Sequence, residues 1–261
     1  MDSTRCFRRS RVPWALCVLL ISTALWGCGS SREVAGSGPE LVVGEFHQVT
    51  DDIPEDSTLT VVASGYRNQM ESHIAEVIGR ADSTFVKGNP EGALGNLAAD
   101  AMLDVIQGLV DEPVDCALTN NGGLRVPIAE GPITVGKVFE LMPFENWMSV
   151  VTLDADGMSR LFSQIATVGG EPIAGCALTI DSETREVVEA TVGGESVEEG
   201  KMYRVVTSDY LVNGGGNMEA LWSPVKQEGI PVLLRDAFLT YIRENGVISP
   251  NLDGRITYVE R

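Results

Sequence analysis

Two glycine-rich segments carry the residues of this sequence that could bind a small polar ligand. The first is Asn120–Arg125 (NNGGLR) and the second is Asp209–Gly216 (DYLVNGGG). Glycine permits positive φ and close approach of the backbone to a ligand, an asparagine amide both donates and accepts, and an arginine offers a planar set of donors. By pattern alone, each segment could equally be an ordinary tight turn.

Two aromatic residues stand where strand-like runs meet loops. Phe144 lies between Pro143 and Glu145, and Tyr210 precedes the triple glycine. Considered singly, either ring could belong to the core. Together with the glycine turns they predict a clamp that stacks a flat base, an interaction worth about 1–3 kcal/mol per base.

Metal chemistry is not expected from this chain. Its only histidines are His47, in a polar N-terminal stretch, and His73, in a predicted helix beside Glu71 and Glu76. Both are expected on the surface, and no CxxC pair or Cys/His cluster indicates zinc. We therefore expect no catalytic residue and no metal ligand, and interpret the chain as a recognition domain, not a self-sufficient enzyme.

The N-terminus has the pattern of an export signal. Four arginines precede the apolar run Trp14–Trp26, which is too short to span a bilayer. The run ends in Gly27-Cys28, similar to the lipobox of bacterial lipoproteins. We expect residues 1–27 to be a signal peptide and Cys28 to carry a lipid anchor at the outer membrane or periplasmic face. The alternatives are an uncleaved anchor or an ordinary signal with a chance cysteine, and each exports the protein.

Charge and cysteine content limit the ligand and the chemistry further. The formal net charge is −18, and loss of the signal removes four arginines and one aspartate, leaving −21. This negative charge disfavours binding to nucleic acids, and an anionic ligand would need local cations or an added metal. Adaptation to high salt would also produce an acidic composition. Cys116 and Cys176 lie in apolar runs of the folded part. The sequence is compatible with a disulfide between them and with two buried free thiols.

The remaining chain divides into a polar tether, residues 28–58, and one domain, residues 59–261. Hydrophobic periodicity predicts helices over Tyr66–Ile78 with Ser64 as cap, Leu94–Leu109, Ala155–Ala166 and Val232–Arg243. Strands are predicted at Asp82–Lys87, Val114–Leu118, Trp147–Leu153, Cys176–Ile180, Glu186–Val192, Tyr203–Thr207 and Arg255–Val259, and Ile133–Leu141 reads as a strand or turn into a short helix. The expected class is α+β with layered sheets.

In order and spacing, the motifs resemble the C-terminal domain of bacterial and animal 5′-nucleotidases, a group that includes UDP-sugar hydrolases and 2′,3′-cyclic phosphodiesterases. The matching stretches are Leu94–Leu97 with Asp100, Asn120–Arg125, Leu141–Phe144, Asp209–Tyr210 and Asn213–Gly215. The resemblance covers roughly Val61 to Tyr258. It implies a layered α-β-β-α domain with mixed or antiparallel sheets that binds the nucleoside half of a nucleotide.

The resemblance also implies roles for single residues. Phe144 and Tyr210 would sandwich the base, Asn120 would hydrogen-bond it, and Arg125 would reach toward the ribose or phosphate. The other implied substrate-binding residues are Gly122, Gly215 and Asn217, and the implied pocket-supporting residues are Asn96 and Asp100, one helical turn apart.

Two positions depart from the family pattern. Gly216 stands where the family usually has an aspartate suited to holding the ribose diol, and Asn217 compensates only weakly. Lys87 stands near the place of a family arginine, for which it is a poor bidentate substitute. Sugar recognition is therefore the part of the resemblance that these residues support least.

Family enzymes hydrolyse phosphate esters at a two-metal centre in a separate metallophosphatase domain. Neither Gly-Asp-x-His nor Gly-Asn-His occurs in this sequence. The resemblance thus implies no cofactor here, and divalent metals only in a separate metallophosphatase chain that completes nucleotide catabolism. A non-catalytic nucleoside-binding lipoprotein and a degenerate scaffold domain are the alternatives.

Overall fold

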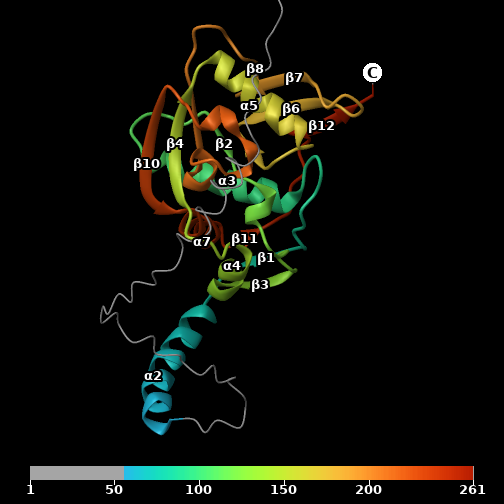
Figure 1. Ribbon diagram of the computed structural model, residues 1–261. Helices are drawn as coiled ribbons and strands as arrows, with labels where there is room; N and C mark the ends of the chain where they lie inside the picture. The colour runs from blue at the N-terminus through green and yellow to red at the C-terminus, as the bar shows by residue number, and fades with distance from the viewer. Residues whose placement is uncertain (1–55, 261) are drawn as a thin grey trace, which may run out of the picture. The chain divides into compact units, whose positions relative to one another are not determined.

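The structure is a computed structural model that describes residues 56–260 (Figure 1). The predicted signal peptide, Cys28, His47 and nearly all of the predicted tether lie outside these residues. The helices are α2 (Ser57–Ile74), α3 (Ala93–Gln107), α4 (Val135–Leu141), α5 (Ala155–Thr167), α6 (Asp209–Val212) and α7 (Leu234–Asn245), with the 3₁₀ turns η1 (Asn121–Gly123), η2 (Gly215–Asn217) and η3 (Glu219–Leu221).

The strands form a five-stranded, a four-stranded and a three-stranded sheet. The five-stranded sheet has the order β10 (Lys226–Leu233), β4 (Trp147–Leu153), β9 (Tyr203–Ser208), β2 (Cys116–Leu118) and β5 (Ile173–Ala174). The four-stranded sheet has the order β12 (Ile256–Val259), β6 (Cys176–Asp181), β7 (Val187–Val192) and β8 (Glu195–Ser196). The smallest sheet has the order β11 (Val247–Ile248), β1 (Val77–Ala81) and β3 (Gly131–Thr134).

Alternation along the strands gives the five-stranded sheet two buried faces. Val150 and Val206 point into a core built with α3, α4 and α7, whereas their neighbours Val151 and Val205 point into a core shared with α5 and the four-stranded sheet. This is the period of two that a pleated strand imposes. The predicted α+β class with layered, mixed sheets is confirmed.

The predicted start of the first helix is wrong. It is expected near Tyr66 with Ser64 as its cap, but α2 begins at Ser57 because the Asp56 carboxylate accepts the N–H groups of Thr58 and Leu59, at 2.8 and 3.1 Å. The Ser64 hydroxyl instead donates to the Val61 carbonyl within the helix, at 2.8 Å. The predicted end is also late, since β1 starts at Val77.

Two strand assignments also change. The alternation over residues 82–87 does not form a strand, and only Phe85 forms a bridge, with Ile128. The strand β10 is not predicted, because its sequence KQEGIPVL contains glycine and proline and lies at a sheet edge where alternation is relaxed.

Cys116 and Cys176 are both buried free thiols. A hydrogen bond with Cys176, together with burial, raises the pKa of the Cys116 thiol well above its ordinary value. Of the two open alternatives, the structure contains the thiol pair. None of the described helices is long and apolar enough to cross a bilayer.

Gly79 tests the packing of β1 against α7. A β-carbon there would lie 2.6 Å from Ile242 Cγ2 and 2.8 Å from the Gly246 carbonyl oxygen. We expect Gly79→Ala to lower the free energy of unfolding by about 1–3 kcal/mol, as overpacking of a closed core does. Urea unfolding measures this change, and the control is Gly229→Ala, where nothing lies within 4 Å of the added carbon. Equal stability of the two variants would contradict the close approach.

Candidate functional site

Three chain segments meet at one edge of the five-stranded sheet. Since β2 and β9 are parallel, with Cys116 opposite Val205, their carboxyl ends lie at the same edge. Since β4 runs antiparallel to β9, with Met148 opposite Ser208, its first residues lie there too. The segments at this edge are η1 after β2, α6 after β9, and residues 142–146 before β4.

A cavity of about 360 Å³ opens where these segments meet. It is lined by Asn120, Gly122, Gly123, Arg125, Phe144, Asn146 and Tyr210. The sequence predicts Asn120, Gly122, Arg125, Phe144 and Tyr210 as ligand-binding residues, and the structure brings all five to this one cavity. Their part in binding stays a prediction.

Arg125 connects the η1 turn to the segment that carries Phe144. Its backbone N–H donates to the Leu141 carbonyl at 2.9 Å, and its Nη1 donates to the Gly122 carbonyl at 3.2 Å. The guanidinium carbon lies 5.9 Å from the centroid of the Phe144 ring, within the range of a cation–π contact. The cation and the aromatic face are thus presented to the cavity together.

The two glycines of η1 leave space for the Asn120 amide. A β-carbon at Gly122 would lie 3.0 Å from Asn120 Nδ2, and one at Gly123 would lie 3.4 Å from Asn120 Oδ1. A larger residue at Gly122 would therefore press on the amide that the cavity exposes. This requirement explains the glycine at position 122 better than the turn conformation does, because Gly122 has no positive φ.

Tyr210 is positioned from the other side of the cavity. The Ser208 hydroxyl accepts the Leu211 N–H at 3.3 Å and starts α6, and Asp209 Oδ1 accepts the Trp147 N–H at 3.1 Å. Tyr210 and Phe144 are each 47% exposed, so each ring keeps a large accessible surface for a ligand. Gly215 does not line the cavity but lies against the Tyr210 ring, where a β-carbon would be 2.4 Å from two ring atoms.

Asn217 and Gly216 lie beyond the ring in the same loop. Asn217 is exposed, has a φ of +56°, and does not line the cavity. Gly216 has a φ of +66°, and a β-carbon there would lie 2.6 Å from Leu211 Cδ2. The loop therefore places no carboxylate among the residues that line the described cavity.

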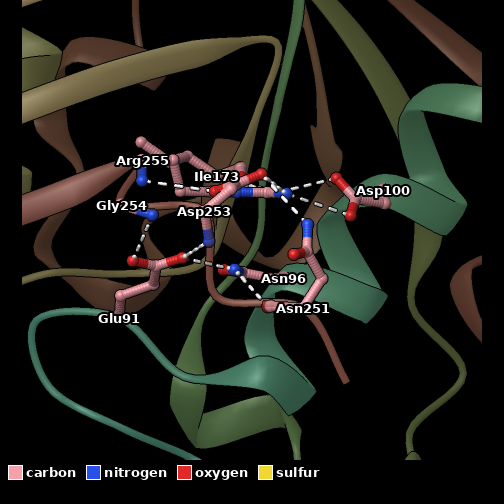
Figure 2. Close-up of polar contacts among 8 residues, drawn as sticks. All are labelled: Glu91, Asn96, Asp100, Ile173, Asn251, Asp253, Gly254 and Arg255. Atoms are coloured by element: carbon pink, nitrogen blue, oxygen red, sulfur yellow. Dashed lines mark hydrogen bonds and ion pairs between the residues drawn. The ribbon is translucent and has the colours of Figure 1, made fainter. Parts of the chain in front are cut away.

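Asn96 lies elsewhere, in a polar cluster on α3 (Figure 2). Its Nδ2 donates to Glu91 Oε1 at 2.5 Å and to the Asn251 carbonyl at 2.9 Å. The Glu91 carboxylate also accepts the N–H groups of Asp253 and Gly254, at 3.2 and 3.1 Å. This cluster fixes the segment that leads into β12.

Asp100, one turn further along α3, forms a two-bond ion pair with Arg255, at 2.6 and 3.1 Å (Figure 2). Burial lowers the pKa of the Arg255 guanidinium, but hydrogen bonds to Asp253 and Asp100 outweigh it and raise that pKa. Arg255 Nη1 also donates to the Ile173 carbonyl of β5, at 2.9 Å. Asn96 and Asp100 line a separate cavity of about 260 Å³ and are not among the residues that line the ligand cavity.

Sequence reasoning does not identify Asn146 or Gly123 as lining residues. Asn146 follows Phe144 by two positions, and its carbonyl accepts the Leu234 N–H at 2.8 Å where α7 begins. A single asparagine has no spacing signal of its own, so only its place two residues after Phe144 could have indicated it. Gly123 lies within the predicted turn, but the prediction names only its neighbour Gly122.

Among residues 56–260 there is no group of three or more His, Cys, Asp or Glu side chains that could hold a metal ion. His73 is exposed on α2, as predicted, with its Nδ1 3.8 Å from a Glu76 oxygen. The donor set of a two-metal centre does not match the described residues. No metal-dependent step is therefore assigned to them.

The profile of the family described as 5′-nucleotidase, C-terminal domain, matches residues 74–222, more than half of the chain. The chain belongs to this family. This 5′-nucleotidase C-terminal domain is 24% identical to mouse 5′-nucleotidase over 239 residues, 80% of this chain and 42% of the mouse protein. It is also 24% identical to the Bacillus subtilis endonuclease YhcR over 194 residues, 72% of this chain and 15% of that protein.

Solved structures share the fold of this chain. The 5′-nucleotidase precursor of Thermus thermophilus matches with a TM-score of 0.68 and 27% identity, over 80% of this chain and 44% of that one. The NAD nucleotidase of Haemophilus influenzae matches in fold, with a TM-score of 0.62 and 15% identity over 79% and 42% of the two chains. This C-terminal domain thus spans less than half the length of each of these relatives.

Gly215 gives a direct test of how the Tyr210 ring is held. We expect Gly215→Ala to turn this half-exposed ring away from its present position, since the added carbon would overlap ring atoms at 2.4 Å. Side-chain NMR resonances of Tyr210 report the displacement. Gly229→Ala, where the added carbon meets nothing, should leave these resonances unchanged. Unshifted Tyr210 signals in Gly215→Ala would contradict the packing of the ring on Gly215.

Proposed function

We propose that this 5′-nucleotidase C-terminal domain binds the nucleoside half of a nucleotide between Phe144 and Tyr210. The observation that carries the proposal is the joint placement of two half-exposed aromatic rings, an asparagine amide and one arginine around a single cavity. A purine or pyrimidine is flat and has donors and acceptors on its edge, so stacking and amide hydrogen bonds suit it. The family membership supports the same ligand class.

The polar groups of the cavity suit the two ends of a nucleotide. The amides of Asn120 and Asn146 suit the edge of the base, because each both donates and accepts. Arg125 is the one cationic side chain among the lining residues and suits the anionic phosphate or the adjoining ribose. In a chain with a formal net charge of −18, this local cation offsets repulsion of a phosphate.

Hydrolysis of the phosphate ester belongs, in this proposal, to a separate metallophosphatase chain docked over the cavity. Holding the nucleoside fixes the phosphate at the partner's metals, and such positioning lowers the barrier by converting an encounter into an intramolecular step. Support comes from the family membership and from the missing donor set among residues 56–260. We also propose that the protein is exported and anchored through a lipid on Cys28.

The binding proposal is tested by titrating the protein with adenosine, AMP and UDP-glucose. Trp147 follows Phe144 by three residues and is 47% exposed, so its fluorescence should report binding. We expect Phe144→Ala and Tyr210→Ala each to weaken binding by about 1–3 kcal/mol, or roughly 5- to 150-fold in Kd. Tyr66→Ala is the matched control, since Tyr66 is an exposed aromatic on α2 outside the cavity.

The alternatives give different results in this titration. A folded protein that binds none of the three ligands would contradict the proposal and favour a degenerate scaffold. Binding that survives both aromatic substitutions would place the nucleoside outside this cavity.

The partner proposal is tested by reconstitution. We expect a metallophosphatase domain, expressed without its own C-terminal domain, to gain AMP hydrolysis when this protein is added, and to lose it when the divalent metal is chelated. Phe144→Ala should raise the KM of the mixture, because the base would no longer be held. Binding of AMP without turnover, across the candidate phosphatases encoded beside this gene, would favour a non-catalytic nucleoside-binding lipoprotein.

A further inference from the structure

The backbone of Asn121 at the start of η1 is held in both of its peptide groups, the one before its Cα and the one after it. Its N–H donates to Glu171 Oε2 at 2.6 Å, and its carbonyl oxygen accepts from Lys87 Nζ at 3.1 Å. The bond to Glu171 is short and involves a charged acceptor, the stronger kind of backbone hydrogen bond. Neither Glu171 nor Lys87 lines the ligand cavity.

Strand pairing brings Glu171 to this place. Leu118 of β2 is opposite Ile173 of β5, and the Thr119 N–H continues the ladder to the Pro172 carbonyl at 3.0 Å. Two residues beyond Thr119, the Asn121 N–H meets the side chain of Glu171, the residue before Pro172. The contact therefore joins residues fifty positions apart in sequence, and no local pattern indicates it.

Glu171 has an environment that a purely solvated glutamate lacks. Burial raises the pKa of its carboxyl group, while hydrogen bonds from Asn121 and the positive charge of Lys87 lower it. Other charged groups nearby are engaged elsewhere: Glu91 accepts from Asp253 and Gly254, and Arg185 bonds Tyr258 beside Gly169. An ionised carboxylate is costly to desolvate, and here the Asn121 N–H and the positive charge of Lys87 offset that cost.

The orientation of the Asn121 peptide determines what the turn presents. Asn120 precedes it directly, and the Gly122 carbonyl that follows accepts from Arg125 Nη1 at 3.2 Å. Rotation of this peptide would shift the Asn120 amide, the Gly122 backbone and the Arg125 side chain together. These are three of the residues that line the cavity.

We infer that Glu171 is a positioning residue of the ligand cavity, whose carboxylate fixes the Asn121 peptide and so sets the placement of Asn120 and Arg125. This inference deepens the proposed nucleoside-binding function and rests on it for its effect on affinity. The effect on the turn itself can be measured without any ligand.

The first experiment follows the backbone amide of Asn121 by NMR as the pH is lowered. While Glu171 is ionised its carboxylate accepts this N–H strongly, and protonation weakens the bond. Because burial raises the pKa of Glu171, the Asn121 signal should shift with a midpoint above the ordinary range of a glutamate. The shift should vanish in Glu171→Gln, and the same titration in Glu189→Ala, a distant exposed glutamate on β7, should match the wild type.

The second experiment compares adenosine affinity among these proteins. We expect Glu171→Ala to weaken binding by about tenfold or more, since a hydrogen bond to a charged group is lost at the turn. Glu171→Gln should recover part of the loss because its amide oxygen still accepts. Glu189→Ala should bind as the wild type does.

The outcomes separate the two proposals. If the wild type binds adenosine and Glu171→Ala binds equally well, the inference about Glu171 is overturned and the proposed function stands. If the wild type binds nothing, the proposed function fails, and the Asn121 titration alone decides whether Glu171 holds the turn. An Asn121 amide that titrates identically in Glu171→Gln overturns the inference in either case.

Discussion

The register of β2, β9 and β4 is the constraint on which the rest of the site depends. β9 is parallel to β2 and antiparallel to β4, and this one mixed arrangement sends three loops to the same sheet edge. A slip of one residue in any of these strands would turn its apolar side chains to the other face, where a different core must be filled. Because both faces are buried, neither core tolerates such a slip, and the positions of the loops follow from packing.

The sheet sets the approximate positions of the loops, and hydrogen bonds between segments then fix these positions more closely. Arg125 bonds the Leu141 carbonyl, Trp147 bonds Asp209, and Leu234 bonds the Asn146 carbonyl. Each bond joins segments that are distant in sequence, so the cavity wall is fixed by the fold and not by any one loop. Away from the cavity wall, the ion pair of Asp100 with Arg255 ties α3 to β5, because Arg255 also bonds the Ile173 carbonyl. The same short strands therefore position the cavity residues and contribute to the stability of the fold.

Local chemistry made part of the fold and of the site predictable. The strand β4 and the motifs around Phe144 and Tyr210 are found from sequence because an apolar run, a proline and glycine turns mark their ends. The features that the sequence does not predict depend on contacts with residues far away in the chain. β10 is a strand only because β4 pairs with it, and Glu171 is an ordinary glutamate made significant by a contact across strands. Asn96 shows the converse case, since it belongs to a recognisable motif yet bonds the chain ahead of β12 and not the cavity wall. A motif thus identifies the family more surely than it identifies the task of each residue.

Gly216 shows how one backbone conformation can limit a ligand's recognition. A carboxylate at this position, which the family resemblance implies, would need a side chain at a φ of +66° and a β-carbon 2.6 Å from Leu211 Cδ2. The close contact opposes a β-carbon here unless the Leu211 side chain moves, and the positive φ disfavours most residues other than glycine, asparagine and aspartate. The lining residues include no carboxylate, so under the proposed function a ribose diol would meet only amides, backbone and Arg125. Selectivity would then rest on the base between Phe144 and Tyr210 and on the charge of the phosphate, with the sugar contributing least.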